Sequence, residues 1–129
     1  MSGKDLENPN GLFIKNNRLY VAAWGIGMRK DWSTKVPGNL YWIDLKTNQK
    51  HYVTKKPLGN LDGLEWSAHH GWLVSDWKAG KVFMVNESGK VKTLVTDLDG
   101  AADIGWHPSK ELLIVPEMNK NKVHAYSMH

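Results

Sequence analysis

The sequence contains no cysteine, which excludes a disulfide framework, a thiolate metal site and a cysteine nucleophile. No apolar run approaches 18 residues, and the N-terminal stretch MSGKDLENPNG has no apolar core of a signal peptide. We therefore expect no membrane span and no signal peptide. The compartment stays open, because chains without cysteine occur on both sides of a membrane.

A concentrated basic face is also missing. The 17 Lys and Arg exceed the 13 Asp and Glu by four, but they are scattered through turns such as 55–56 and 119–122. Because no recognition motif accompanies this charge, we expect a solvated surface and no nucleic-acid partner. The sequence has no Gly-rich phosphate loop and no Ser nucleophile motif, and its six histidines lack zinc-ligand spacing.

Helical periodicity is nearly absent, whereas short runs of β-branched and aromatic residues recur between Gly, Asn, Asp and Pro. This pattern predicts an all-β fold. The clearest set of strands covers 63–67, 72–77, 81–85 and 91–96, which would form one four-stranded antiparallel meander. The sequence also holds seven Trp, a large number for this length.

The same outline occurs three times when the copies are anchored on Asn10, Asp62 and Asp103. A four-stranded meander repeated about every 40 residues is the unit of a β-propeller, so we predict three blades at about 8–57, 58–98 and 99–129. The first copy carries an insertion at 25–38, which we expect to be a functional or interface loop.

Three blades cannot close a ring, because an open arc leaves two large apolar blade faces in water. The chain is therefore expected to be either a fragment of a larger propeller or half of one. In the second case two copies would form a two-fold homodimer with six blades. The third copy stops after its third strand, and the segment 2–6 could pair with the edge strand 123–127 of the second copy.

Several motifs resemble the senescence marker protein/gluconolactonase family: NPNGL followed by LYVAAWG, LGNLDGLEW with WLVSDWKAGKVFMV, and GAADIGWHP with LLIVPEMNKNKVHAY. The likeness runs from Asn8 to Tyr126 and covers the latter half of a six-bladed member. It implies a divalent ion, commonly Ca²⁺, at the channel mouth and hydrolysis of sugar lactones or related esters.

In that family the ion is held by an Asn of an Asn-Gly motif, an Asp of an Asp-Gly motif and a Glu from the first blade. Asn10 and Asp62 match the first two ligands. The Glu has no counterpart, because its blade is missing from this sequence.

The expected strand pairing, taken without the resemblance, places candidate ligands at the same channel mouth. A residue that opens an innermost strand lies beside one that closes the antiparallel second strand, so Asp62 should neighbour Asp76, and Asp103 should neighbour Glu117. Asn10, Asp62 and Asp103 would then form a hard-cation site with oxygen ligands. The alternative is that Asn-Gly and Asp-Gly merely begin turns.

Trp24, Trp32 and Trp77 occupy loop-side positions from which they could stack on a small-molecule ligand, whereas the other Trp residues are expected to pack between blades. His69 and His70 fall in a hairpin turn at the opposite end from Asp62. We therefore expect them to play no part in the site.

If the protein is a hydrolase, the ion would act as a Lewis acid on the lactone carbonyl while Asp62, or a neighbouring acid, activates water. The fold is equally compatible with a non-catalytic scaffold that binds a small molecule or a protein, and with a truncated fragment that has no activity.

Overall fold

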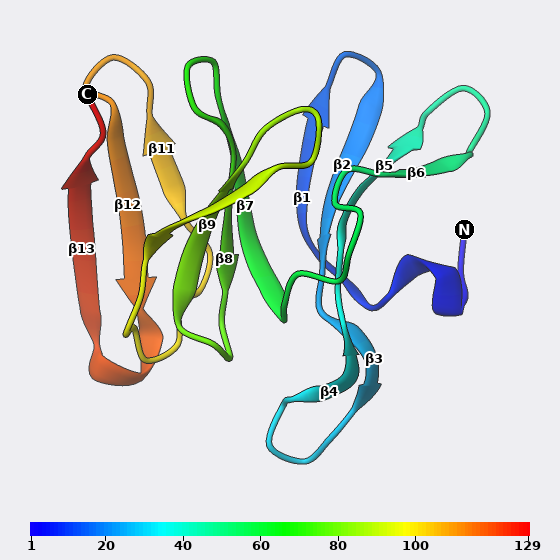
Figure 1. Ribbon diagram of the computed structural model, residues 1–129, viewed down its shortest axis with the longest axis horizontal. Helices are drawn as coiled ribbons and strands as arrows, with labels where there is room; N and C mark the ends of the chain where they lie inside the picture. Colours follow the sequence, from blue (N-terminus) through cyan, green and yellow to red (C-terminus); the bar gives the residue numbers. More distant parts are fainter.

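The computed structural model describes residues 1–129 as three twisted antiparallel sheets that stand side by side in an arc (Figure 1). The first sheet has the order β1-β2-β5-β6, with bounds Pro9–Lys15, Arg18–Ala23, Leu40–Asp44 and Lys50–Tyr52. The second contains β7 to β10, with bounds Leu61–Ser67, Gly71–Asp76, Lys81–Val85 and Val91–Val95. The third contains β11 to β13, with bounds Gly105–His107, Leu112–Glu117 and Lys122–Ser127.

Two smaller pieces complete the chain. Strands β3 (Gly25–Met28) and β4 (Thr34–Pro37) pair as a separate hairpin that projects from one end of the first sheet (Figure 1). The helical segments are two 3₁₀ turns, η1 (Lys4–Leu6) and η2 (Met118–Lys120). No helix has the length and apolar character needed to cross a membrane.

The all-β prediction is confirmed, and the predicted strand at 81–85 coincides with β9. The third sheet has three strands, as expected from a third copy that stops after its third strand. The insertion at 25–38, expected as a functional or interface loop, forms a β-hairpin, and positive φ angles at Gly25 and Gly27 permit its backbone path.

Backbone hydrogen bonds define which residues are equivalent in the three sheets. The amides that follow β2, β8 and β12 each donate to a carbonyl just before the inner strand: Trp24 to Asn8, Trp77 to Asn60, and Met118 to Gly100. Two residues beyond these carbonyls lie Asn10, Asp62 and Ala102. The first two anchors of the repeat are therefore equivalent in space, and the third is not Asp103.

Asp103 instead takes the position that glycine occupies in the other two sheets, so the sequence anchor of the third copy is wrong by one residue. The cause is the first hairpin turn of that sheet. Trp66 pairs with Trp72 in the second sheet, whereas Trp106 pairs with Leu113 in the third, which makes the third turn one residue longer. Because of this extra residue, counting back from the later strands of the third copy places its anchor one residue too late, at Asp103.

The glycines of the Asn-Gly and Asp-Gly motifs let neighbouring inner strands approach closely. A Cβ atom on Gly11 would collide with the carbonyl oxygen of Asp62, and one on Gly63 would collide with the backbone of Asp103 and Ile104. A side chain at either position would push two sheets apart. These motifs therefore have a packing role that is separate from the chemistry of the residue before each glycine.

The core lies between the sheets. The largest cluster joins the first two sheets and includes Tyr20, Leu40, Trp72, Val74, Phe83 and Val85. A second cluster joins the second and third sheets and includes Leu73, Val82, Leu113 and Val115. Alternate residues of β8 thus face opposite neighbours, which explains why this strand is buried along nearly its whole length.

Candidate functional site

Three carboxylates lie near one another around the inner strands of the second and third sheets. Asp62 and Glu65 belong to β7 and are half-buried, and Asp103 lies exposed just before β11. Burial raises the pKa of both Asp62 and Glu65, and the negative charge of Asp103 raises both further. We call the end of the sheets where β1 and β7 begin the mouth; Asp62 and Asp103 lie there.

These acids have no partners within the protein. None of its hydrogen bonds reaches the carboxylate of Asp62, Glu65 or Asp103, and none of its salt bridges involves them. Half-buried carboxylates without donors are unfavourable, because they lose hydration without gaining hydrogen bonds. The arrangement suits a ligand that supplies positive charge.

Asn10 lies at the equivalent place on β1. Its side-chain nitrogen donates to the carbonyl oxygen of Leu61 at 3.2 Å, which ties the first sheet to the second. Because the nitrogen takes that bond, the amide oxygen of Asn10 remains free to accept from a donor or to bind a cation. The pair Asn10 and Asp62 therefore combines a packing role with available oxygen atoms.

The donor chemistry fits a hard cation, since carboxylate and amide oxygens are the ligands that Ca²⁺ accepts. The geometry fits only in part. No group of three or more His, Cys, Asp or Glu side chains is gathered closely enough to hold a metal. Further oxygen ligands would have to come from the Asn10 amide, from backbone carbonyls or from another copy of the chain.

Asp76 and Glu117 are placed in register beside the mouth residues, but their carboxylates are engaged elsewhere. Asp76 pairs with Leu61, is 4% exposed and accepts a hydrogen bond from the Ala79 amide at 3.0 Å. Burial raises its pKa. Asp76 therefore caps the turn that follows β8. The backbone of Glu117 pairs with that of Ala101 through an isolated β-bridge.

Glu117 has an equivalent role at the end of β12. It accepts from the Asp99 amide at 2.8 Å and lies 3.0 Å from His124 Nε2, and these hydrogen bonds lower its pKa. Because its oxygens are already satisfied, Glu117 is less available to a ligand than Asp62.

A shallow hollow of about 270 Å³ opens at the mouth beside Asn10. Trp24, Met28 and Trp32 form its apolar part, and Asn8, Pro9 and Asn10 complete it. The indole nitrogen of Trp24 donates to the backbone carbonyl oxygen of Trp32 at 2.9 Å, so the Trp24 ring is tied to the hairpin that carries Trp32. Two of the three tryptophans that the sequence analysis singled out thus meet at Asn10.

Trp77 lies behind this hollow instead of lining it. Its ring centroid is 5.9 Å from that of Trp24, and its indole lies close to Gly100. Trp77 therefore supports Trp24 from the second sheet, while Trp32, which is 56% exposed, presents its ring to solvent.

The β3–β4 hairpin that carries Trp32 is fastened to both sheets. Asn60 donates to the carbonyl of Trp24 and to the hydroxyl of Thr34, at 2.7 and 2.8 Å. Lys78 of the second sheet donates to the carbonyl of Asp31 at the hairpin tip. The sequence analysis did not predict this role of Asn60. Asn60 is the repeat equivalent of Asn8, whose side chain also donates to the hairpin, at the carbonyl of Gly25, so the repeated asparagine was an available signal.

His69 and His70 lie in the β7–β8 turn, away from the mouth. Both are near Glu111 of the third sheet, with nitrogen to oxygen distances of 3.3 and 3.4 Å. The His70 ring also packs edge-on against Trp106. These contacts hold two sheets together at the end opposite Asp62.

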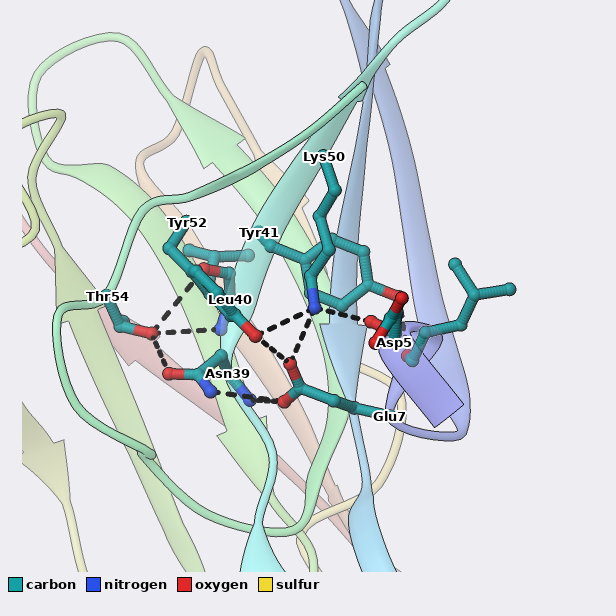
Figure 2. A network of polar contacts seen from close by, with 9 residues as sticks. Asp5, Glu7, Asn39, Leu40, Tyr41, Lys50, Tyr52 and Thr54 are labelled. Carbon is teal, nitrogen blue, oxygen red and sulfur yellow. Dashed lines mark hydrogen bonds and ion pairs between the residues drawn. The ribbon is translucent and has the colours of Figure 1, made fainter. Parts of the chain in front are cut away.

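A further buried acid, Glu7, was not foreseen. It is 5% exposed and bonds Lys50 Nζ at 2.8 Å, the Tyr52 hydroxyl at 2.7 Å, and both the amide and side chain of Asn39 at 3.1 Å (Figure 2). Thr54 extends the network by donating to Asn39 at 2.9 Å. The donors outweigh the desolvation caused by burial, so the pKa of Glu7 is lowered.

The network ties the N-terminal segment to the first sheet. Lys50 also donates to the carbonyl of Asp5, and the Tyr41 hydroxyl donates to the carbonyl of Leu6 at 2.5 Å. Every oxygen of Glu7 has a protein donor, so this acid has a structural role.

No family model and no curated protein sequence matches the chain. Among solved structures, it is similar to virginiamycin B lyase from Staphylococcus aureus, a catalytically inactive H270A variant described with quinupristin. The TM-score is 0.65 at 15% sequence identity, over 99% of this chain and 44% of the lyase chain. The lyase has a β-propeller fold. The likeness confirms that the chain is an all-β propeller fragment, which spans less than half of that neighbour.

Proposed function

We propose that this chain is half of a propeller ring that binds a divalent cation and a small molecule at its mouth, and that two copies close the ring. The observation that carries the cation site is the absence of any protein donor around Asp62, Glu65 and Asp103. Raised pKa values of Asp62 and Glu65 indicate that the folded protein holds negative charge at a cost, which a bound Ca²⁺ would remove.

Asn10 and Asp62 are the first ligands in this proposal, with Asp103 beside them. Both positions open inner strands at equivalent places, and Gly11 and Gly63 keep those strands close. The ion would polarise a carbonyl oxygen of a bound ester.

Asp62 is the residue that we assign to proton transfer. No internal hydrogen bond competes for its oxygens, so one oxygen could bind the ion while the other accepts a proton. It would take one proton from the attacking water as the water oxygen bonds to the carbonyl carbon, and it would return that proton to the alcohol oxygen as the ester C–O bond breaks. Trp24 and Trp32 would hold the apolar part of the substrate. The resemblance to the senescence marker protein/gluconolactonase family supports a lactone or related ester as that substrate.

Ring closure is supported by the two ends of the arc. Leu12 and Ile14 of β1 are 59% and 68% exposed on the free side of the first sheet. At the other end, Val123 of β13 is 72% exposed, and β13 has no further strand beside it. A second copy would cover both ends at once and would bring a second Asn10 and Asp62 to the axis.

One experiment tests closure. Sedimentation at micromolar concentration is expected to give a single species of twice 14.6 kDa. The variant Ile14→Glu should reduce it to a monomer, because a charge would be buried at the new interface. A wild-type protein that sediments as a stable monomer would contradict ring closure.

A second experiment tests activity. The protein is assayed against a panel of lactones and aryl esters with calcium and with a chelator, and hydrolysis is expected only with calcium. Asp62→Asn should abolish it, whereas His69→Ala should leave it unchanged. Equal rates with calcium and chelator, or in Asp62→Asn, would contradict the assignment of Asp62.

A binding scaffold without turnover is the second candidate. It is favoured by the observation that no three acidic or histidine side chains gather at one point in a single chain. Calcium binding without hydrolysis of any ester in the panel would support this candidate.

A further inference from the structure

The chemistry of the hollow of about 270 Å³ at the mouth limits what it can bind. None of its lining residues carries a charge. Asn8 donates to the carbonyl of Gly25 at 2.7 Å, and Asn10 donates to the carbonyl of Leu61 at 3.2 Å, so both amides already use an N–H group. Pro9, between them, has no backbone N–H. The hollow therefore offers few donors to a ligand that carries many hydroxyl groups, and such a ligand would lose hydration without regaining hydrogen bonds.

The ring of Trp32 is free to contact a ligand. Trp32 is 56% exposed, and its ring packs against no other aromatic ring and lies under no lysine or arginine. Trp42 differs in this respect, because His51 stacks on its ring and Arg18 also lies over it. Trp24, which is partly exposed, gives the hollow a second indole wall.

The backbone of Trp32 has a conformation that bulky residues rarely adopt. Its φ angle is 70°, in the left-handed region. Trp32 lies in the turn between β3 and β4, where its amide donates to the carbonyl of Arg29 at 3.1 Å. Asparagine or glycine would occupy this position with less strain. The fold therefore gains little from a tryptophan here, and strain of this kind is often found at functional sites.

The hollow adjoins the residues proposed to act on an ester. Asn10 forms part of its wall and also contacts the carbonyl of Leu61, the residue before Asp62. The β3–β4 hairpin stands at the same end of the molecule as the starts of β1 and β7 (Figure 1). The negative charges of Asp62 and Asp103 disfavour an anionic ligand at this end. A group that lies on Trp32 would keep an attached ester beside Asn10.

We propose that this hollow binds a flat, uncharged apolar ring, so that the substrates of the mouth are phenyl and similar aryl esters instead of polyhydroxylated sugar lactones. The ring would lie on Trp32 and against Trp24 and Met28, with the ester directed towards Asn10. Burial of the ring and its contacts with the indoles provide the binding free energy. The inference rests on the ester hydrolysis proposed for the mouth, but binding of the ring itself needs neither the cation nor Asp62.

The first test measures binding without chemistry. Acetanilide, the amide counterpart of phenyl acetate, is titrated against the full chain and followed by the broadening of its ring-proton NMR signals. The wild type is expected to bind it saturably, and to bind N-cyclohexylacetamide, which has no flat ring, more weakly. Trp32→Asn should weaken acetanilide binding about tenfold, whereas Trp32→Phe, which keeps a flat ring, should weaken it less than about threefold.

Two controls separate a lost binding surface from a lost fold. Trp32→Asn should not lower the thermal midpoint, because asparagine adopts a positive φ angle more readily than tryptophan. Leu45→Asn makes a similar change from an apolar side chain to asparagine at a residue that is 42% exposed in the turn between β5 and β6, and acetanilide binding should be unchanged. A lower thermal midpoint in Trp32→Asn, or equal losses of binding in the two variants, would overturn the inference.

The second test compares substrates in the presence of calcium. The kcat/KM for phenyl acetate is expected to exceed that for glucono-δ-lactone by about tenfold or more, because the hollow leaves the hydroxyl groups of the sugar lactone unpaired. Acetanilide binding as described, without hydrolysis of either ester, would contradict hydrolysis at the mouth and support the hollow as the site of an apolar ring. Faster or equal hydrolysis of glucono-δ-lactone, or no saturable acetanilide binding, would overturn the inference and leave the proposed hydrolysis standing.

Discussion

Glu7 and Asp62 are both withdrawn from water, yet their surroundings differ in every other respect. Glu7 is bonded to Lys50, Tyr52 and Asn39, and its pKa is lowered (Figure 2). Asp62 has no donor and lies near Asp103, and its pKa is raised. Burial alone would raise both values, so the donors make the difference. The comparison separates a carboxylate that holds the fold together from one that awaits a ligand.

The largest effect should come from removing the charge of Glu7. Glu7→Gln leaves Lys50 buried without its carboxylate, and breaking such a pair costs about 3 kcal/mol of unfolding free energy. Urea unfolding followed by Trp fluorescence measures the loss. Glu87→Gln is the control, since Glu87 also faces a lysine but is exposed, and its stability should match the wild type. A similar loss in both variants would contradict the structural role assigned to the buried Glu7–Lys50 pair.

Acidification should change the stability contribution of Asp62 and Glu65 in the opposite direction to that of Glu7. The folded-state pKa of Asp62 and Glu65 is raised, so the folded protein binds their protons more tightly than the unfolded chain, and stability rises as pH falls through those values. The pKa of Glu7 is lowered, so its contribution is present above about pH 4.5 and is lost as pH falls through its folded-state value.

The thermal midpoint measured between pH 7 and pH 3 should therefore pass through a maximum on the acid side before it falls. Asp62→Asn should flatten the rise, and Glu7→Gln should weaken the fall. A midpoint that falls steadily from pH 7 in both wild type and Asp62→Asn would count against the raised pKa of Asp62.

A smaller effect is expected from Asp62→Asn without calcium at pH 7. Removing an unpaired charge beside Asp103 should stabilise the protein by roughly 0.5 kcal/mol, after allowance for solvent screening. A melting curve detects the increase. The substitution Glu117→Gln should instead destabilise, because hydrogen bonds from His124 and from the Asp99 amide lower the pKa of the Glu117 carboxyl and so stabilise its charged form. Stabilisation in both variants would mean that the two acids do not differ in role.

Much of the fold could be predicted from the sequence, because each strand is marked by its own residues and by the turns that flank it. The repeat also placed Asn10 and Asp62 correctly at equivalent positions. The third copy was misaligned, since one extra residue in the turn before β12 shifts Asp103 to the place of a glycine. The pattern of residues within each strand is the same with or without this extra turn residue, so it does not reveal the shift.

The parts that could not be predicted depend on contacts between distant residues. Glu7 meets Lys50 across 43 positions, a contact that no local sequence pattern announces. Glu65 joins the mouth acids only because Asp103 of the next sheet lies near it. The hairpin around Trp32 is likewise held by Asn60 and Lys78 from the second sheet.

Calcium titration by calorimetry at pH 7, on the wild type and on Asp62→Asn, tests whether the mouth acids bind a cation. We predict saturable binding by the wild type, its loss in Asp62→Asn, and unchanged binding in Glu87→Gln and His70→Ala. Binding that survives in Asp62→Asn, or no binding by the wild type, would contradict the assignment of the mouth acids to a cation.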